Sequence, residues 1–113
     1  MSVTFAFIFK FMLIILTTMP NIEEAESLAK KIVETKLAAC VQILPAVKSF
    51  YVWENELQEN SEHLLLIKTL EAKFEELEQF IKTNHSYEIP EIVAISAEKV
   101  SGNYLSWVQE SLV

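Results

Sequence analysis

Three side chains of this sequence, Cys40, His63 and His85, carry the thiolate and imidazole groups that copper(II) and zinc prefer as ligands. Their spacing matches no compact ligand motif such as CxxC or HExxH, so only the fold can assemble a metal site. We place the first candidate ligand at His85, because Tyr87 and Glu91 follow it in a segment that comes after a predicted helix. The alternative is a histidine at a helix terminus, stabilised there by the helix dipole.

Cys40 is the second candidate metal ligand. It lies in the apolar stretch at residues 38–41. Free cysteine is among the most buried residue types, so a thiol packed in the core is the competing interpretation. His63 follows Glu62 on a predicted strand, where a surface or interface role is the simpler interpretation.

The charged residues exclude several classes of function. All sixteen acidic residues are glutamate and all nine basic residues are lysine, which leaves a net charge of −7. Without arginine the chain lacks the planar group that grips phosphate and reads bases, so we expect no nucleic-acid partner. Without aspartate it has neither a DxDxDG calcium loop nor a Ser-His-Asp triad. Glu88 and Glu91 are more typical of a solvated pair than of a catalytic acid and base, so we predict that the protein is not an enzyme.

Residues 3–16 are the segment that most resembles a targeting signal. Lys10 interrupts this apolar run, no small-residue cleavage site follows it, and it is too short to span a bilayer. We therefore predict an extension over residues 1–11, with Met12 as a candidate start, and a single domain over residues 12–113. A signal peptide is the alternative. The lone cysteine excludes an internal disulfide, so we expect a cytoplasmic protein with no membrane partner.

The elements that would position these residues follow from the hydrophobic pattern. An apolar run at residues 13–16, ended by Pro20 and Asn21, predicts a buried strand. Asn21 with Glu24 three residues later is typical of a helix start. The apolar positions that then repeat at helical spacing are Ile22, Ala25, Ala29, Ile32 and Val33.

Residues 39–53 and 57–69 predict two strands that are long against a usual length of about 5–6 residues. Residues 54–56 form the turn between them, and Pro45 predicts a bulge, a bend or an exposed edge in the first strand.

The carboxyl-terminal half of the sequence predicts three more elements. Residues 70–81 repeat again at helical spacing, and residues 84–87 interrupt that helix. Residues 89–97 predict a strand, and a short helix follows Gly102.

The elements occur in the order β-α-β-β-α-β, followed by the C-terminal helix. Because crossover connections are right-handed, this order predicts an α+β, ferredoxin-like antiparallel sheet with both main helices on one face. A sheet covered on one face alternates apolar and polar residues, yet residues 13–16, 64–67 and 92–95 are apolar on both faces. An uncovered face of this kind predicts that other copies of the chain cover it.

Several stretches of the sequence resemble the CutA (divalent-cation tolerance) family, in one order and across residues 12–113. They are LTTMPN at residues 16–21, VETKLAACVQILPAVKSFYVWE at 33–54, SEHLLLIKT at 61–69, HSYEIPEIVA at 85–94 and YLSW at 104–107. The resemblance implies a ferredoxin-like homotrimer whose long hairpins interlock around a threefold axis, which agrees with the two-faced strands.

The resemblance also implies a role in the tolerance of divalent metals, with copper binding attributed to some members through the histidine that matches His85. The chain departs from such members in having Thr17 where some have cysteine, Asn84 where some have a second histidine, and Ser86 where proline is common. A site for Cu²⁺ or another divalent cation would therefore bind weakly here or share ligands between subunits.

A cleft between subunits of such a trimer is the second candidate site. Six residues near strand ends offer the aromatic walls and few polar groups of a small-molecule pocket. They are Tyr51, Trp53, Glu59, Lys68, Tyr87 and Glu91. The competing interpretation is that these rings only supply interface contacts. Signal-transducing PII proteins share this fold and bind small molecules in such clefts, so our alternative function is a trimeric small-molecule-sensing regulator.

Overall fold

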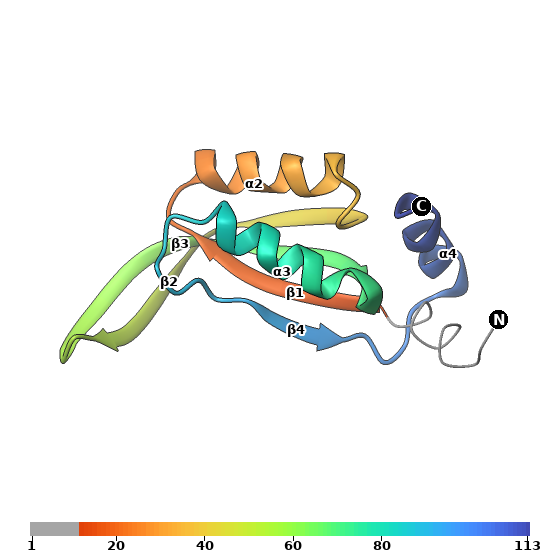
Figure 1. The fold of residues 1–113 in the computed structure, drawn as a ribbon. Coiled ribbons are helices and arrows are strands. Elements are labelled where there is room, and N and C mark those ends of the chain that lie inside the picture. Colours follow the sequence, from red (N-terminus) through yellow and green to blue (C-terminus); the bar gives the residue numbers. More distant parts are fainter. Residues whose placement is uncertain (1–11) are drawn as a thin grey trace.

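A four-stranded antiparallel sheet with the strand order β2-β3-β1-β4 organises the computed structural model, which describes residues 12–113 (Figure 1). The strands are β1 (Met12–Met19), β2 (Cys40–Trp53), β3 (Glu56–Leu70) and β4 (Val93–Ser96). The helices are α2 (Ile22–Glu34), the 3-10 turn η1 (Glu71–Lys73), α3 (Phe74–Thr83) and α4 (Gly102–Ser111). The predicted α+β class and order of elements are confirmed, while the predicted extension lies outside the described residues.

Helices α2 and α3 bury their apolar stripes against one face of the sheet (Figure 1). The sheet contributes alternate residues of β1 and β3, as the period of two requires. The largest fully buried members of this core are Ile15, Met19, Leu28, Ile32, Leu65, Ile67, Leu77 and Ile81. Burying each such side chain contributes about 1.5–3 kcal/mol to folding. Ile22 and Val33, which the sequence places on the apolar stripe of α2, are exposed instead.

The amino terminus of α2 is capped as the sequence predicts. The Asn21 Oδ1 atom accepts a hydrogen bond of 2.8 Å from the backbone N–H of Glu24. The Asn21 Nδ2 atom donates at 2.8 Å to the Glu24 carboxylate. Such a cap stabilises a helix by about 1 kcal/mol, and it sets the direction in which the chain leaves β1.

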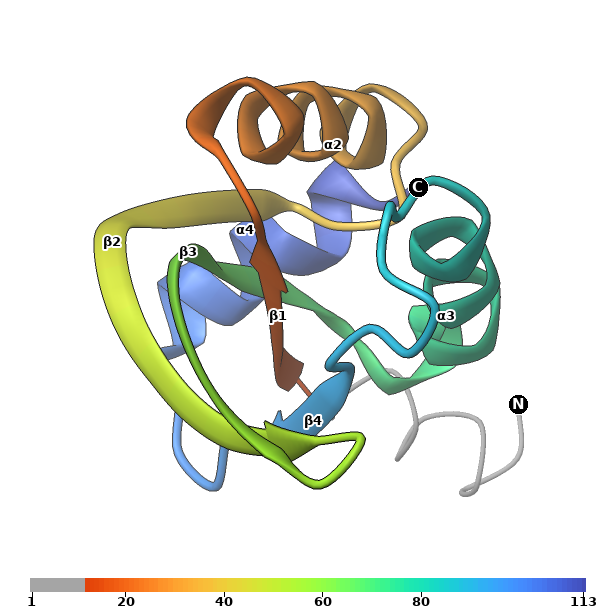
Figure 2. The ribbon, with the colours of Figure 1, turned by 90° about the vertical axis from the view of Figure 1, so that its left-hand side faces the viewer.

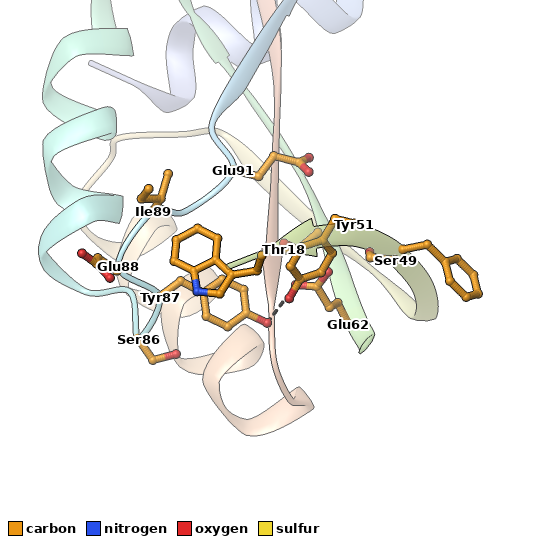
Figure 3. A pocket seen from close by; sticks show the side chains of 11 residues that line it. Thr18, Ser49, Tyr51, Glu62, Ser86, Tyr87, Glu88, Ile89 and Glu91 are labelled. Atoms are coloured by element: carbon orange, nitrogen blue, oxygen red, sulfur yellow. Dashed lines mark hydrogen bonds between the residues drawn. The ribbon is translucent and has the colours of Figure 1, made fainter. Parts of the chain in front are cut away.

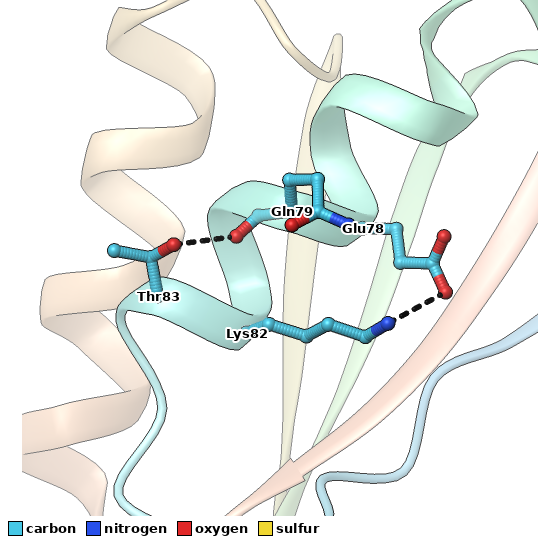
Figure 4. Close-up of polar contacts among 4 residues, drawn as sticks. All are labelled: Glu78, Gln79, Lys82 and Thr83. Atoms are coloured by element: carbon cyan, nitrogen blue, oxygen red, sulfur yellow. Dashed lines mark hydrogen bonds and ion pairs between the residues drawn. The ribbon is translucent and has the colours of Figure 1, made fainter.

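The last turn of α3 is held by contacts within the helix (Figure 4). The Lys82 ammonium lies 3.3 Å from the Glu78 carboxylate, and the Thr83 hydroxyl donates at 2.9 Å to the Gln79 carbonyl oxygen. Asn84 then leaves the helical conformation, as expected. The chain turns here toward the end of β1.

The hairpin of β2 and β3 projects beyond the helices (Figure 1). Its two-residue turn places Glu54 at φ 51° and Asn55 at φ 65°, and positive φ at both central residues matches the right-handed twist of a hairpin. The register shifts between Leu44 and Val47, so of the bulge, bend or exposed edge predicted at Pro45 the structure has an irregularity of the bulge type. Figure 2, which looks from the hairpin side, shows the two strands curling together around the end of the sheet.

The second face of the sheet is covered at one end. Val108 and Leu112, in and just after α4, pack there on Met12, Ala39 and Leu70, away from the hairpin (Figure 1). The rest of this face exposes apolar side chains of β2 and β4, namely those of Leu44, Val93 and Ile95. The helix therefore covers more of this face than the sequence analysis assumed, and leaves a smaller open patch.

Strand β4 is shorter than the predicted strand over residues 89–97. It begins at Val93 and pairs only with residues 13–16 of β1. Pro90 has no N–H to donate, which disfavours an earlier start of the ladder. Residues 84–92 consequently form an irregular segment that runs toward the base of the hairpin.

Candidate functional site

A cleft of about 630 Å³ lies where this irregular segment faces the hairpin and the end of β1 (Figure 3). Eleven residues line it. They are Thr18 from β1, Ser49, Phe50, Tyr51 and Trp53 from β2, Glu62 from β3, and Ser86, Tyr87, Glu88, Ile89 and Glu91 from the segment before β4. Parts of the chain that are distant in the sequence thus build one site.

Glu62 is the buried acidic group of the cleft, with only 6% of its surface exposed. The Tyr87 hydroxyl donates a hydrogen bond of 2.8 Å to its Oε2 atom (Figure 3). Ser49 and Thr18 also hydrogen-bond to its carboxylate. Three hydroxyl-bearing residues from separate elements therefore hold this side chain in place.

Glu62 carries a negative charge in this setting. Burial by itself raises the pKa of Glu62, but the hydrogen bonds from Ser49, Tyr87 and Thr18, together with the proximity of His85, outweigh burial and bring that pKa below its ordinary value. Burial and the adjacent Glu62 carboxylate raise the pKa of Tyr87, so its hydroxyl stays protonated and remains a donor. The described residues form ion pairs between Lys48 and Glu59 and between Lys82 and Glu78, and Glu62 takes part in neither.

His85 lies beside the cleft with both ring nitrogens engaged. The Tyr87 backbone N–H donates at 3.0 Å to Nδ1, and Nε2 lies 2.7 Å from the Thr18 carbonyl oxygen. Because Nδ1 accepts, Nε2 carries the proton and donates to that carbonyl. The two rings of His85 and Tyr87 also contact each other, with centroids 4.8 Å apart. A metal ion at His85 would have to break one of these hydrogen bonds.

Cys40, the other predicted metal ligand, lies far from His85 within one chain. His85 contacts Thr18, next to Met19 at the end of β1. Cys40 pairs with Lys68 across the sheet, whereas His63 pairs with Met19. Lys68 and His63 are five residues apart on β3, which separates their backbones by about 17 Å. The His63 Nδ1 atom is buried without a hydrogen-bond partner. Across residues 12–113, no three His, Cys, Asp or Glu side chains gather closely enough to hold a metal, so ligation by His85 and Cys40 stays a prediction.

Tyr51, Trp53, Tyr87 and Glu91, four of the six residues predicted for a cleft between subunits, line this cleft within one chain, and the cleft between subunits stays a prediction. Glu59 does not, because strand alternation directs it to the opposite face of the hairpin, where it pairs with Lys48 at 3.1 Å. Lys68 does not either, because its ammonium lies 5.5 Å from the centre of the Tyr104 ring on α4.

The sequence analysis missed Glu62, the most buried acidic residue of the cleft. One signal was available. Glu62 shares a strand face with Leu64 and Leu66, so it is a charged residue directly beside an apolar run on that face. The hydroxyls of Thr18 and Ser49 gave no comparable signal, since serine and threonine are common on strands and in turns.

Comparisons with known proteins agree on one group of relatives. Residues 13–111 match the family model described as CutA1 divalent ion tolerance protein. The chloroplastic protein CutA of Arabidopsis thaliana is 41% identical over 99 residues, which make up 88% of this chain and 54% of that protein. The divalent-cation tolerance protein CutA of Thermus thermophilus is 42% identical over 98 residues, which make up 87% of this chain and 95% of that protein.

The fold agrees with that of solved relatives. The structure of the periplasmic divalent cation tolerance protein CutA from Archaeoglobus fulgidus matches with a TM-score of 0.88 at 39% identity. The match covers 90% of this chain and 99% of that one. This chain thus spans about half the length of the plant relative and nearly all of the archaeal structure.

Proposed function

The chain belongs to the CutA1 divalent ion tolerance family, and from that premise we propose that it acts as a non-catalytic homotrimer in the tolerance of divalent cations, copper among them. The acidic cleft beside His85 is the observation that supports cation binding. Three glutamates and no basic residue line this cleft, so it attracts positive ions.

The trimer is supported by two exposed apolar patches on different parts of the chain. One lies on the open second face of the sheet at Leu44, Val93 and Ile95, and the other lies on the hairpin at Val52 and Leu57. A hairpin from one copy can therefore cover the sheet of the next. Contact between two different patches is heterologous. Where the rotation between successive copies closes, such contacts form a ring, and we propose the ring of three.

Sedimentation velocity at micromolar concentration tests the trimer. Val93→Glu places a charge on the open patch and should shift the protein to smaller species. Val33→Glu is the matched control, because Val33 is exposed to a similar extent, 41% against 48%, but lies on α2 outside both patches. A stable, folded single subunit of the unmodified protein would contradict the proposal.

The divalent-cation site is proposed at His85, with glutamates of the cleft nearby. Binding there is weak, because ligation by the imidazole removes a hydrogen bond that contributes about 1 kcal/mol. Thr17 and Asn84 offer neither thiolate nor imidazole to compensate. A ligand from another subunit, such as Cys40, would strengthen the site.

Calorimetry with copper tests this site. His85→Ala should weaken copper binding at least about tenfold, whereas His63→Ala, which removes the other imidazole, should leave it unchanged. A parallel loss in Cys40→Ser would place the site between subunits, since His85 and Cys40 lie apart within one chain. Unchanged affinity in His85→Ala would contradict the proposed site.

A small-molecule-sensing regulator is the second candidate function. The cleft volume of about 630 Å³ supports it, because such volumes are typical of small-molecule sites and exceed the need of one ion. Thermal-shift screening of metabolites in a chelating buffer, run beside divalent metals without chelator, separates the two functions. If divalent metals stabilised the protein and no metabolite did, only the divalent-cation function would remain.

We keep the cytoplasm as the proposed location, supported by the lone cysteine. Relatives carry other locations in their names, chloroplastic in Arabidopsis thaliana and periplasmic in Archaeoglobus fulgidus. Within residues 12–113 no helix has the length and hydropathy that crossing a bilayer requires. Fractionation of the source cells, followed by immunodetection, tests the assignment.

A further inference from the structure

The lining of the cleft combines two features that together select one class of ligand. Aromatic rings form much of its wall, and a buried carboxylate lies among them. We propose that the cleft binds a small organic cation, an amine or quaternary ammonium group, with the Glu62 carboxylate as its counter-charge. The rings that would surround this group are those of Tyr51, Trp53 and Tyr87. The inference rests on the second candidate function and goes beyond the divalent-cation role.

Glu62 is a buried carboxylate without an ion-pair partner among residues 12–113. A carboxylate that is 6% exposed loses most of its hydration, which costs several kcal/mol unless other groups compensate. Hydroxyl hydrogen bonds keep Glu62 ionised, but no lysine of residues 12–113 forms an ion pair with it. A cation that enters the cleft would provide the ion pair that Glu62 lacks among residues 12–113.

Aromatic rings are the second feature of the cleft lining. The face of an aromatic ring carries partial negative charge and attracts cations within about 6 Å of its centre. Among the described residues, the lysine placed over a ring is Lys68, and its ring is Tyr104 on α4 rather than any ring of the cleft. Tyr87 donates to the Glu62 carboxylate, and Tyr51 lines the same cleft, so a bound cation can meet rings and carboxylate together (Figure 3).

Size and ligand count favour an organic cation over a bare metal ion in this position. Metal ions require several oxygen, nitrogen or sulfur ligands at about 2.0–2.6 Å. No such group of three His, Cys, Asp or Glu side chains forms anywhere in residues 12–113. An organic cation needs one carboxylate and apolar or aromatic contact, and a volume of about 630 Å³ accommodates its carbon skeleton.

Trp53 makes a direct test feasible. The chain has two tryptophans, and Trp107→Phe leaves Trp53 in the cleft wall as the fluorescent reporter. The assembled protein in EDTA buffer is titrated with choline and, separately, with 3,3-dimethylbutan-1-ol, which has the same shape without the charge. Choline should change the Trp53 emission saturably and bind at least about tenfold tighter than the alcohol.

Two variants test whether the Glu62 carboxylate is the counter-charge of the bound cation. Glu62→Gln should weaken choline binding at least about tenfold and leave the alcohol unaffected. Glu59→Gln makes the same change on the opposite face of the hairpin and should leave choline binding intact. If Glu62→Gln does not fold, the comparison of choline with the alcohol in the unmodified cleft still decides.

Equal affinity for the two probes, no binding of choline at millimolar concentration, or choline binding that survives in folded Glu62→Gln would each overturn the inference. The outcomes also separate it from the proposed functions. Equal affinity would retain a small-molecule cleft without charge selection. Copper binding is measured independently, without EDTA and with His85→Ala, so its loss would not affect the choline result.

Discussion

The two halves of β3 have opposite surroundings. In the carboxyl-terminal half, the strand lies between β1 and β2, helices cover it, and Leu65, Ile67 and Thr69 are fully buried. In the amino-terminal half, over residues 56–61, it pairs with β2 alone and Leu57 is 74% exposed. One continuous strand therefore serves the core of the subunit with one half and an external surface with the other.

Glu62 marks the boundary between these halves. The core half is stabilised by apolar contacts that the chain makes with itself, and each removed contact lowers the stability of the subunit. The hairpin half leaves apolar side chains in water and holds a buried charge with no salt bridge among the described residues. A single subunit does not need exposed apolar side chains or a buried unpaired charge in order to fold. Assembly and ligand binding explain these two features better.

The sharpest separation of the two halves should come from two leucine truncations. Leu65→Ala should lower the free energy of unfolding by about 2–5 kcal/mol, because it leaves a cavity in the core. Leu57→Ala should cost the subunit less than about 0.5 kcal/mol and act on the trimer instead. Denaturant unfolding at two protein concentrations measures both, since only loss of assembly depends on concentration. If both variants lost the same free energy of unfolding at every protein concentration, the two halves of β3 would not differ in role.

A buried hydrogen bond provides the next test of the core half. The Thr69 hydroxyl donates at 2.7 Å to the Leu37 carbonyl oxygen. Thr69→Val keeps the shape but leaves that carbonyl without its donor, so we expect a loss of about 1–2 kcal/mol in thermal or chemical unfolding. Ser61→Ala, in the exposed half of the strand, is the control and should change stability by less than about 0.5 kcal/mol. A larger loss of stability in Ser61→Ala than in Thr69→Val would contradict the stronger contribution of the core half.

Glu62 should contribute to the pH dependence of stability in acid. Because the folded-state pKa of Glu62 lies below its ordinary value of 4.5, its ionised form stabilises the fold fully above that pH. This contribution is lost as the pH falls through the lowered folded-state pKa. Below pH 4.5, the free energy of unfolding should therefore decrease less steeply with falling pH for Glu62→Gln than for the unmodified protein. Glu59→Gln should keep the original slope, and the same flattening in both variants would argue against a special role for Glu62.

The smallest effect is expected at the exposed ion pair of the hairpin. Lys48 and Glu59 lie 3.1 Å apart, but their side chains are 68% and 53% exposed. Lys48→Ala should change the free energy of unfolding by no more than about 0.5 kcal/mol, and less at high salt. Denaturant titrations at low and high ionic strength measure this. A loss above about 1 kcal/mol would mean that the hairpin half is buried more deeply in the assembly than proposed.

Local chemistry explains why most of the fold could be predicted. The cap formed by Asn21 and Glu24 lies within one helical turn, and the bulge at Pro45 follows from a missing N–H group. Helix and strand periods likewise depend on residues a few positions apart. These features are decided by neighbours in the chain, so the sequence alone contains them.

The errors arose where packing between elements decides. Val33 satisfies the helical period, yet it lies on the exposed side of α2, because the position of the sheet selects which residues of a broad stripe are covered. The shortened β4 pairs only with residues 13–16 of β1, and Pro90, which has no N–H to donate, disfavours an earlier start. His85 was identified from its neighbours, but only the fold places the Thr18 carbonyl oxygen 2.7 Å from its ring.

Glu59 and Glu62 illustrate the division most clearly. They have the same side chain, three residues apart on one strand, so they project to opposite faces. The long hairpin and the aromatic residues along its strands follow directly from the pattern of residues 39–69. The burial of Glu62 rather than Glu59 beside Tyr87 depends on packing, because that contact requires β1, β2, β3 and the segment after α3 to converge. Periodicity and capping act over a few residues, whereas a cleft is made by segments that the folded chain alone brings together.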